Sequence, residues 1–421
     1  MSNEFNINQA VVLCGGLGLR LRPLTENLPK PMIDINGKPF LFYLLEQLSE
    51  QGINNFLLLT GYLGEKIQEY FKDGSQYGWN IQYSKGPVEW DTGRRIWEAR
   101  GLIESEFMLL YSDNFIQFNL NSLAEVHCKT KAVLSFILVK KNNGNIALSK
   151  DGVIQNYDKD RQGFELDYVE LGYMIIHKQE IFEYFTHISN FPDFNFSSVI
   201  KLLVLDNKIS GLVVHDSYYS ISDPTRLHLM TEYLKPKKIL LLDRDGTINK
   251  KAYQGEYITK WADFEWIDDT RNGLERLSQQ GFSFVILTNQ AGIARGIVDP
   301  NALDEIHKKM VEELAKNGVN ILKIYICPDH WNSHSFMRKP APGMFFKASY
   351  DFKLRLDRTF YIGDDERDCI AAFNAGCGMI FINNEEEKIT LNNFPVPFVA
   401  TKSLNNSTSY IINTYNTWNL S

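Results

Sequence analysis

The chain has 421 residues, of which 44% are hydrophobic and 23% charged, and its formal net charge is −7. This length exceeds one ordinary hydrophobic core, and the composition is that of a globular protein, so two domains are expected. The mildly acidic balance and the lack of a Lys/Arg-rich run exclude the usual electrostatic signature of a nucleic-acid-binding protein.

The sequence also indicates where the protein resides. It contains no run of 18 apolar residues, so we expect no membrane-spanning helix and no membrane partner. The polar segment from Met1 to Gln9 lacks the pattern of a secretory signal. The cysteines are scattered and odd in number, which favours a reducing compartment; they are Cys14, Cys128, Cys327, Cys369 and Cys377. We therefore expect a cytoplasmic protein, and both a monomer and a homo-oligomer are compatible with the sequence.

Buried-strand patterns alternate with helical patterns in both halves of the chain. Apolar runs without alternation occur at 10–14 and 239–242, and helical patterns follow at 40–51 and 269–280. Such runs are typical of strands buried on both faces of a parallel sheet. We therefore predict an α/β protein with two domains, each a mainly parallel sheet flanked by helices.

The segment 233–238 contains a proline and three lysines just before a new strand pattern. This predicts a domain boundary that gives domains of 1–234 and 235–421. The Asn-, Ser- and Thr-rich tail from Asn383 still carries apolar runs, at 396–399 and 410–412, so order is predicted to near its end.

Acidic and hydroxyl side chains follow three apolar runs of the C-terminal half, and a lysine lies in the run Arg338-Lys339-Pro340. In chain order they are Asp243, Asp245, Thr288, Asn289, Lys339, Asp364, Asp365 and Asp368. Ligands of open parallel sheets bind outside the carboxyl ends of the strands, so we expect these side chains to converge on one edge.

Phosphoryl transfer to a carboxylate requires this set of groups. Asp243 is predicted to be the nucleophile, and Asp245 to protonate the leaving oxygen and then take a proton from water. Mg²⁺ prefers oxygen ligands, which Asp243, Asp245 and Asp364 are predicted to supply. Thr288 and Lys339 are predicted to bind the oxygens of the transferred group.

The order of these motifs resembles the haloacid dehalogenase superfamily of phosphatases over roughly residues 238–385. The runs Asn289–Gly296 and Arg338–Met344 are similar to heptose-1,7-bisphosphate phosphatases and histidinol phosphatases, which lack a large cap domain. This resemblance implies that Asn289, Arg295 and Arg338 contact the substrate phosphate or sugar.

The chain departs from this resemblance in a loop that often binds zinc. Cys327 is present, but Asp329, Ser335 and Met337 stand where further ligands would be. Cys327, His330 and His334 would give only three of the four N or S ligands of a structural zinc site. We therefore favour surface histidines in a loop over a zinc site.

The N-terminal half begins with a glycine turn directly after a strand pattern. Gly15, Gly16 and Gly18 let the backbone approach a phosphate and donate N–H groups. The turn is neither a Walker loop nor a complete dinucleotide fingerprint. The cations Arg20 and Lys30 lie just downstream, and prolines on both sides of Lys30 restrict the chain around it.

The run from Gly15 to Met32 resembles sugar-1-phosphate nucleotidyltransferases, and the resemblance spans about residues 9–232. It implies that Arg20 and Lys30 neutralise a nucleoside triphosphate as a sugar phosphate attacks, and that Asp113 binds Mg²⁺. The remaining implied residues are Gly15, Gly16, Gly18 and Thr92 for the nucleotide, Lys159 for the sugar phosphate, and Glu170 and Gly172 for the sugar.

Several residues depart from the nucleotidyltransferase pattern. Leu19 replaces a threonine, Ser112 replaces a glycine, and residues 90–94 replace a glycine-rich loop beside the base. Ser220 stands at the second metal aspartate, for which Asp216 or Asp223 would have to substitute. The N-terminal half is thus either a divergent enzyme, a slow one, or a domain that only binds.

Together the two resemblances imply successive steps of sugar-nucleotide biosynthesis for surface polysaccharide. The first removes the 7-phosphate of a heptose 1,7-bisphosphate, and the second joins the sugar 1-phosphate to a nucleotide, with GTP favoured and CTP a competitor. The alternative is a histidinol-phosphate-like phosphatase with a non-catalytic or CTP-using N-terminal domain. Sugar phosphate and nucleoside triphosphate are the expected partners, with Mg²⁺ in both domains.

Overall fold

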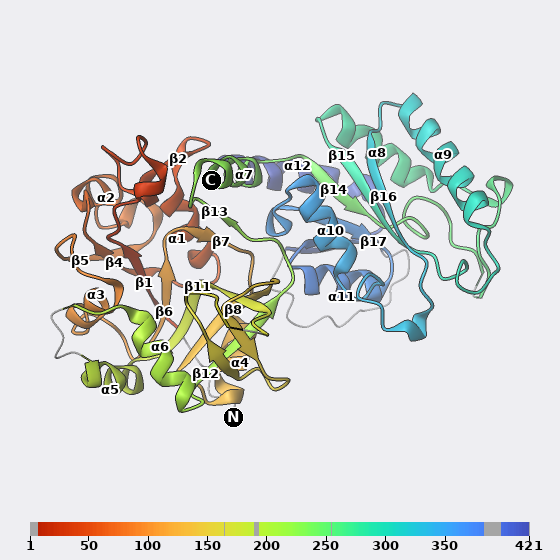
Figure 1. Ribbon diagram of the computed structural model, residues 1–421. Coiled ribbons are helices and arrows are strands. Elements are labelled where there is room, and N and C mark those ends of the chain that lie inside the picture. Colours follow the sequence, from red (N-terminus) through yellow and green to blue (C-terminus); the bar gives the residue numbers. More distant parts are fainter. Residues whose placement is uncertain (1–6, 164, 189–192, 254, 383–396, 421) are drawn as a thin grey trace. The chain divides into compact units, whose positions relative to one another are not determined.

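The computed structural model describes residues 7–163, 165–188, 193–253, 255–382 and 397–420. Contacts divide the chain into two compact units, Met1–Leu234 and Lys235–Ser421 (Figure 1). Within the described ranges, none of the helices combines the length and apolar character needed to cross a membrane.

The N-terminal unit is built on a nine-stranded sheet whose parallel part carries the glycine turn. Its order is β5 (Asn80–Lys85), β4 (Asn55–Thr60), β1 (Gln9–Cys14) and β6 (Glu106–Tyr111), all parallel. Alternate residues of β1 enter two different cores, one holding Val12 and the other Val11 and Leu13. This two-sided burial explains the continuous apolar run in the sequence.

The other half of this sheet is largely antiparallel. β11 (Tyr168–His177) runs antiparallel to β6 and to β8 (Leu134–Lys140), and β8 pairs in parallel with β12 (Ile209–Val214). β9 (Ile146–Leu148) and β10 (Ile154–Tyr157) extend the sheet beyond β11. The sheet is therefore mixed, and its parallel part lies around β1.

Seven α-helices, three short 3-10 helices and two small ribbons complete the described part of the N-terminal unit. The helices are α1 (Phe40–Ser49), α2 (Gly64–Phe71), α3 (Thr92–Glu98), α4 (Leu120–Thr130), α5 (Lys178–Ile188), α6 (Phe196–Leu205) and α7 (Pro224–Leu234). The ribbons are β2 (Asp34–Ile35) with β3 (Lys38–Pro39), and β7 (Asn114–Phe115) with β13 (Tyr219–Ser220).

The C-terminal unit has a six-stranded sheet in which every pair is parallel. Its order is β16 (Ile321–Cys327), β15 (Ser283–Asn289), β14 (Ile239–Leu242), β17 (Phe360–Gly363), β18 (Gly378–Ile382) and β19 (Phe398–Thr401). The chain winds away from β14 in both directions, so the switch point lies between β14 and β17. In such sheets a crevice for a ligand forms outside the carboxyl ends of these strands.

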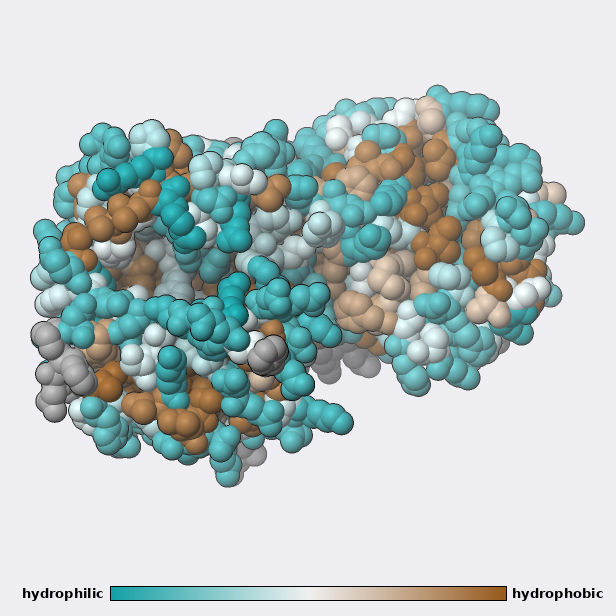
Figure 2. Space-filling model, viewed as in Figure 1, coloured by the Kyte–Doolittle hydropathy of each residue, from teal (hydrophilic) through white to brown (hydrophobic). Residues whose placement is uncertain are grey.

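Helices cover both faces of this sheet. They are α8 (Asp268–Gln279), α9 (Pro300–Lys316), α10 (Gly343–Phe352), α11 (Glu366–Ala375) and α12 (Leu404–Leu420). Leu240 and Leu242 enter one core, and Leu241 enters the other. Figure 2 shows apolar side chains gathered over the part of this unit where β15 and β16 lie.

The tail of the chain contributes both a strand and a helix. β19 extends the sheet, and α12 packs into the core through Leu404, Ile411 and Tyr415. The predicted apolar run at 410–412 thus lies in a helix. Of the predicted ordered tail, residues 383–396 lie outside the described ranges.

Candidate active sites

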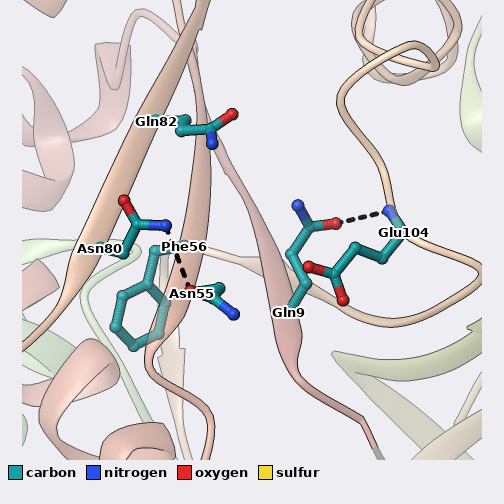
Figure 3. A pocket seen from close by; sticks show the side chains of 6 residues that line it. All are labelled: Gln9, Asn55, Phe56, Asn80, Gln82 and Glu104. Atoms are coloured by element: carbon teal, nitrogen blue, oxygen red, sulfur yellow. Dashed lines mark hydrogen bonds between the residues drawn. The ribbon is translucent and has the colours of Figure 1, made fainter.

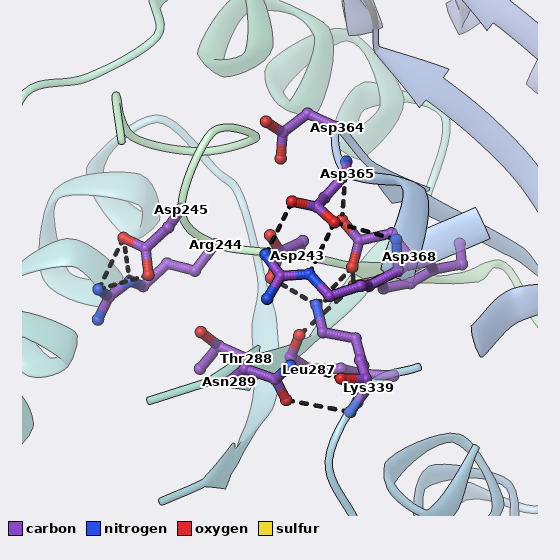
Figure 4. Close-up of polar contacts among 12 residues, drawn as sticks. Asp243, Arg244, Asp245, Leu287, Thr288, Asn289, Lys339, Asp364, Asp365 and Asp368 are labelled. Atoms are coloured by element: carbon purple, nitrogen blue, oxygen red, sulfur yellow. Dashed lines mark hydrogen bonds and ion pairs between the residues drawn. The ribbon is translucent and has the colours of Figure 1, made fainter. Parts of the chain in front are cut away.

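Three carboxylates meet at the switch point of the C-terminal sheet. Asp243 follows β14, Asp364 follows β17, and Asp368 lies in the first turn of α11. One oxygen of each lies within 4.8 Å of the others (Figure 4). Asp368 is fixed by the capping box that begins α11, where Asp365 is the N-cap and Asp368 the third residue of the helix.

Lys339 supplies the positive charge at the centre of this cluster. Its Nζ donates to Oδ1 of Asp243 and Oδ1 of Asp368, each at 2.7 Å, and to the Tyr361 hydroxyl at 2.6 Å. Burial works to lower the pKa of Lys339, but the two carboxylates outweigh it and the pKa is raised. The ammonium therefore stays charged.

Asn289 positions Lys339 through the backbone. Its Oδ1 accepts from the Lys339 N–H at 3.1 Å, and its Nδ2 donates to the Lys339 carbonyl at 3.0 Å. Asn289 was predicted to contact substrate, and in this structure both ends of its amide are used to hold Lys339.

The electrostatics of the cluster are suited to a cation. Burial raises the pKa of Asp243 to about 7, with Asp368 and Asp364 adding to the rise and Lys339 opposing it. Burial also raises the pKa of Asp364 to about 6. Among the described atoms, Oδ1 of Asp364 is buried without a hydrogen-bond partner. A buried unpaired oxygen beside two further carboxylates fits the ligand preference of Mg²⁺.

The side chain of Asp245, which was predicted to be a metal ligand, contacts other groups in this structure, and the group of three potential metal ligands does not include it. Its carboxylate accepts from Arg244 at 2.7 and 2.8 Å, from Asn249 at 3.0 Å and from Gln290 at 2.8 Å. These contacts turn Asp245 away from the three-carboxylate cluster (Figure 4). Burial favours a raised pKa, but Arg244 and the other donors lower it, so Asp245 is ionised in this arrangement.

Thr288 and Gln290 line the same edge at the end of β15. Gln290 Nε2 donates to Oγ1 of Thr288 at 2.9 Å as well as to Asp245. Thr288 belongs to β15 itself, whereas the sequence pattern predicted that it would follow the strand. The residue still lies at the carboxyl end of the strand, where a phosphoryl group would bind.

The three residues considered as zinc ligands, for which the sequence favoured surface positions, lie at the end of β16 and in the loop after it. Cys327 Sγ lies 3.6 Å from Asp329 Oδ2, and the His330 ring accepts from the Asn332 N–H at 3.2 Å. Within the described ranges, the three-carboxylate cluster is the one group of potential metal ligands, and Cys327, His330 and His334 form none. Arg338 donates to the Asp329 carbonyl at 3.1 Å, and Arg295 contacts the rings of Tyr257 and Trp331.

Sequence reasoning missed several residues of this site. Lys251 Nζ lies 2.6 Å from Asp364 Oδ2, and Tyr361 joins Lys339 to Asp368. Arg244 is fully buried and contacts His307 Nε2 at 2.9 Å. The sequence contains one sign of these contacts, which is that Arg244 is a charged residue between the two aspartates Asp243 and Asp245.

In the N-terminal unit, the glycine turn follows β1 and leads to the two predicted cations. Gly18 has a φ of 62° and precedes the short helix Leu19–Leu21, in which Arg20 is exposed. Lys30 forms an ion pair with Asp113, with Nζ and Oδ2 2.9 Å apart. The structure thus brings together Lys30 and Asp113, which are 83 positions apart in the chain.

Arg95 is a buried cation beneath the same turn. A Cβ on Gly15 would lie 2.4 Å from its guanidinium carbon, and Cβ atoms on Gly61 and Gly86 would also lie close to it. These glycines follow β1, β4 and β5, and their lack of side chains makes room for the guanidinium. Arg95 donates to the Thr60 carbonyl at 2.8 Å and to the Pro87 carbonyl at 2.5 Å.

Ser220 lies beside Asp113, where the resemblance places a second metal aspartate. Ser220 pairs with Asn114 in the β13–β7 ribbon, and the Ile221 N–H donates to the Asp113 carbonyl at 2.9 Å. Asp223 instead caps α7 and pairs with Arg226. Asp216 accepts from the Ser217 N–H. Within the described ranges, no group of three potential metal ligands includes Asp113.

The other residues predicted to bind the sugar, its phosphate or the nucleotide range from buried to exposed. Burial raises the pKa of Glu170 to about 7, and its Oε2 accepts from the Gly172 N–H at 2.9 Å. Gly172 has a φ of 74° and packs against Tyr111. Lys159 is exposed, and Thr92 Oγ1 accepts from the Phe196 N–H at 3.1 Å.

A polar depression lies at the opposite edge of the N-terminal sheet (Figure 3). It is lined by Gln9, Asn55, Phe56, Asn80, Gln82 and Glu104. Its side chains largely bond one another or nearby backbone, as in the contacts of Gln9 with the Glu104 N–H and of Asn80 with Asn55. The depression is at the amino ends of β1, β4 and β5, away from the glycine turns.

The two units of the chain match two different protein families. Residues 9–160 match the nucleotidyl transferase family, and residues 238–376 match the polynucleotide kinase 3 phosphatase family. The D-glycero-alpha-D-manno-heptose-1,7-bisphosphate 7-phosphatase of Campylobacter jejuni is 36% identical over 36% of this chain and 85% of its own length. The chain belongs to this phosphatase family through its C-terminal unit.

The N-terminal unit has its own relatives. The D-glycero-alpha-D-manno-heptose 1-phosphate guanylyltransferase of C. jejuni is 42% identical over 27% of this chain. The matched part spans about half, 52%, of that protein.

Among solved structures, a phosphatase is also similar to this chain. The D,D-heptose 1,7-bisphosphate phosphatase of B. bronchiseptica complexed with magnesium and phosphate is 28% identical, with a TM-score of 0.39. The match covers 42% of this chain and 98% of that one.

Proposed function

We propose that this chain removes the 7-phosphate of a heptose 1,7-bisphosphate and then joins the sugar 1-phosphate to a nucleotide. The observation that carries the proposal is the buried contact of Lys339 with Asp243 and Asp368 at the switch point of a phosphatase-family unit. The names of the C. jejuni relatives of the two units support the same pair of steps.

In the first step, Asp243 attacks the phosphorus of the 7-phosphate, and the bond from phosphorus to the sugar oxygen breaks. Lys339 and Thr288 hold the phosphoryl oxygens. Asp245 first turns from Arg244 and takes up a proton from solvent, because it is ionised beside the guanidinium. It then gives this proton to the leaving oxygen, and later takes a proton from the water that splits the aspartyl-phosphate. A Mg²⁺ ion held by Asp243, Asp364 and Asp368 would supply the positive charge that lets an anionic substrate approach these carboxylates.

In the second step, an oxygen of the sugar 1-phosphate attacks the α-phosphorus of a nucleoside triphosphate, and pyrophosphate leaves. Lys30 and Arg20 neutralise the triphosphate beside the glycine turn. Asp113 would hold Mg²⁺ with the help of the substrate phosphates. GTP is the favoured nucleotide because of the resemblance of the N-terminal run, and the changed loop at 90–94 keeps CTP as a competitor.

The test is phosphorus NMR of the full chain with Mg²⁺, a heptose 1,7-bisphosphate and GTP or CTP. The expected result is loss of the 7-phosphate signal followed by new diphosphate-diester signals. Asp243→Asn should block the first change, while heptose 1-phosphate supplied directly is still converted. Lys30→Met should leave the first change intact and block the second. A wild-type chain that leaves the bisphosphate unchanged would refute the phosphatase half.

A second candidate differs only in the N-terminal unit, which would bind a sugar nucleotide without turnover. Ser220 favours it, because a lone Asp113 holds Mg²⁺ through one carboxylate. In that case GTP or CTP would bind in calorimetry, yet no pyrophosphate would form from heptose 1-phosphate.

The alternative for the C-terminal unit is a histidinol-type phosphatase. Histidinol phosphate therefore serves as the comparison substrate, and hydrolysis faster than that of heptose 1,7-bisphosphate would favour this alternative.

A further inference from the structure

The guanidinium of Arg95 lies at the carboxyl ends of three neighbouring parallel strands. Arg95 belongs to α3 and is only 5% exposed. Gly15, Gly61 and Gly86 follow β1, β4 and β5, which are neighbours in the sheet (Figure 1). A Cβ on Gly15 would lie 2.4 Å from the guanidinium carbon, and a Cβ on Gly61 would lie 2.7 Å from Nη2. The strand ends therefore enclose this cation.

Backbone carbonyls are the hydrogen-bond partners of this guanidinium. Nη1 donates to the Thr60 carbonyl at 2.8 Å, and Nη2 donates to the Pro87 carbonyl at 2.5 Å. The Gly86 N–H donates to the same Thr60 carbonyl at 3.1 Å, so Arg95 is fixed where the ends of β4 and β5 meet. Carbonyl dipoles satisfy the N–H groups, but they do not cancel a full positive charge.

No carboxylate within the described ranges forms an ion pair with Arg95. The preceding residue in the helix, Arg94, does form one, with Glu98 at 2.5 Å. Burial lowers the pKa of Arg95, and Asp193 and Asp91 oppose this effect only from a distance. A guanidinium nevertheless stays charged at neutral pH. Arg95 is therefore a buried positive charge that the protein compensates only in part, whereas buried charges are usually paired.

The glycine turn begins directly over this charge, at Gly15. The turn leads to two further cations, Arg20 and Lys30. Lys30 is already paired with Asp113 at 2.9 Å, and Arg20 is exposed, so that solvent and salt screen its charge. Arg95 has neither a carboxylate partner nor solvent around it. Because the surrounding dielectric constant is low, its charge acts over a longer distance, and an anion held by the turn would be attracted without contacting it.

We propose that Arg95 is the counter-charge for the polyphosphate of a nucleotide bound at the glycine turn. It is a positioning residue, because it is buried and acts across the turn. Its contribution grows with the negative charge of the ligand, so it favours a nucleoside triphosphate over the nucleoside. The proposal rests on nucleotide binding in the proposed function, and it applies equally to an N-terminal unit that turns over and to one that only binds.

The experiment measures ligand binding to the full chain by calorimetry. The ligands are GTP or CTP, whichever binds the wild-type chain more tightly, and the corresponding nucleoside. Arg95→Gln should weaken triphosphate binding about 10-fold and change nucleoside binding by less than about 2-fold. Arg95→Lys keeps the charge and should restore most of the triphosphate affinity. The matched control is Arg100→Gln, which removes the same charge from an exposed position just after α3 and should weaken triphosphate binding by less than about 2-fold.

A merely structural role for Arg95 predicts a different pattern. If Arg95 only shaped the turn, Arg95→Gln would weaken triphosphate and nucleoside by the same factor, and this result would overturn the proposal. The effect of salt gives a second readout. The loss of triphosphate affinity in Arg95→Gln should be nearly the same at low and at high salt, because a buried charge is little screened. A loss that disappears at high salt would also overturn the proposal.

The outcomes separate this proposal from the proposed function. If the wild-type chain binds neither nucleotide, nucleotide binding fails and the counter-charge fails with it. If the wild-type chain binds a triphosphate but forms no pyrophosphate from heptose 1-phosphate, the transferase step alone fails, and the binding comparison still decides the role of Arg95. Should urea unfolding show that Arg95→Gln does not fold, Arg95→Lys decides. A triphosphate affinity within about 3-fold of wild type supports the counter-charge, and a loss of about 10-fold in the folded variant overturns it.

Discussion

The ammonium of Lys339 lies 2.7 Å from Oδ1 of Asp243, and the two side chains are only 3% and 10% exposed. A carboxylate buried this deeply is costly to ionise, and the neighbouring Asp368 and Asp364 add to that cost. Lys339 is the group that offsets it. In the proposed phosphatase reaction, this ion pair would prepare Asp243 as the nucleophile and place a cation where phosphoryl oxygens would bind.

Lys339→Met is expected to lower phosphatase kcat at least about 100-fold, because it removes a preorganised charge from the reacting group. It also leaves two buried carboxylates without their cation, a change that typically destabilises by about 3–5 kcal/mol. Both effects are measured on the full chain, by hydrolysis rates and by urea unfolding. A variant with near-normal kcat would show that Lys339 has a structural role only.

Lys251 occupies a position beside the proposed Mg²⁺ ligands. Its Nζ lies 2.6 Å from Asp364 Oδ2 and 3.5 Å from Asp365 Oδ2. Because an ammonium competes with a metal for the same oxygens, Lys251→Ala should tighten Mg²⁺ binding several-fold in calorimetry. The matched control is Lys250→Ala, whose exposed pair with Glu265 should not affect the metal. Weaker binding in Lys251→Ala would instead mean that Lys251 helps to hold the site.

The strand-end pattern of the sequence predicted where Asp243, Thr288 and Asp364 lie, because buried parallel strands bring their carboxyl ends to one edge. The direction of the Asp245 side chain could not be predicted in this way. It depends on Arg244, and Arg244 contacts His307, which is 63 positions away in the chain. A sequence motif relates residues that are close in the chain. The contact of Arg244 with His307 depends instead on how α9 packs against the sheet.

In the N-terminal unit, the sequence singled out the glycine turn, Lys30 and Asp113, but it did not predict the ion pair of Lys30 with Asp113. It did not reach Arg95, since the three glycines that surround the guanidinium follow three different strands. The three glycines surround the same guanidinium only because β1, β4 and β5 are neighbours in the sheet. The antiparallel pairing of β11 with β6 and β8 was likewise not visible, because a strand buried on both faces has the same pattern in either direction.

Arg95→Ala is expected to destabilise the N-terminal unit by about 2–4 kcal/mol. The change leaves a cavity between the glycines and removes donors from the Thr60 and Pro87 carbonyls. The measurement is urea unfolding together with the KM for the nucleotide, which should rise as the glycine turn loosens. The control is Arg94→Ala, whose partly exposed i,i+4 pair with Glu98 should contribute about 0.5 kcal/mol or less. Equal losses in both variants would refute a special role for Arg95.

His127 makes the stability of the N-terminal unit depend on pH. Its Nδ1 lies 2.7 Å from Ser135 Oγ, which in turn lies 2.7 Å from Ser210 Oγ, in a buried network. Burial, with a smaller effect of His177, lowers the pKa of His127 from 6.5 to about 4. The unfolded chain therefore binds a proton below pH 6.5 that the folded chain does not bind until about pH 4.

The expected result is that His127 reduces the free energy of unfolding as pH falls from 6.5 to 4, by about 1.4 kcal/mol for each pH unit. His127→Gln keeps a neutral polar side chain and should remove this part of the pH dependence, although it lowers stability at pH 7.5 by disturbing the network. Urea unfolding of both proteins between pH 7.5 and 4.5 gives the difference in slope. His228→Gln, at an exposed position of α7, serves as the control and should keep the wild-type slope. Parallel curves for wild type and His127→Gln would show that His127 is protonated in the folded chain as readily as in the unfolded one.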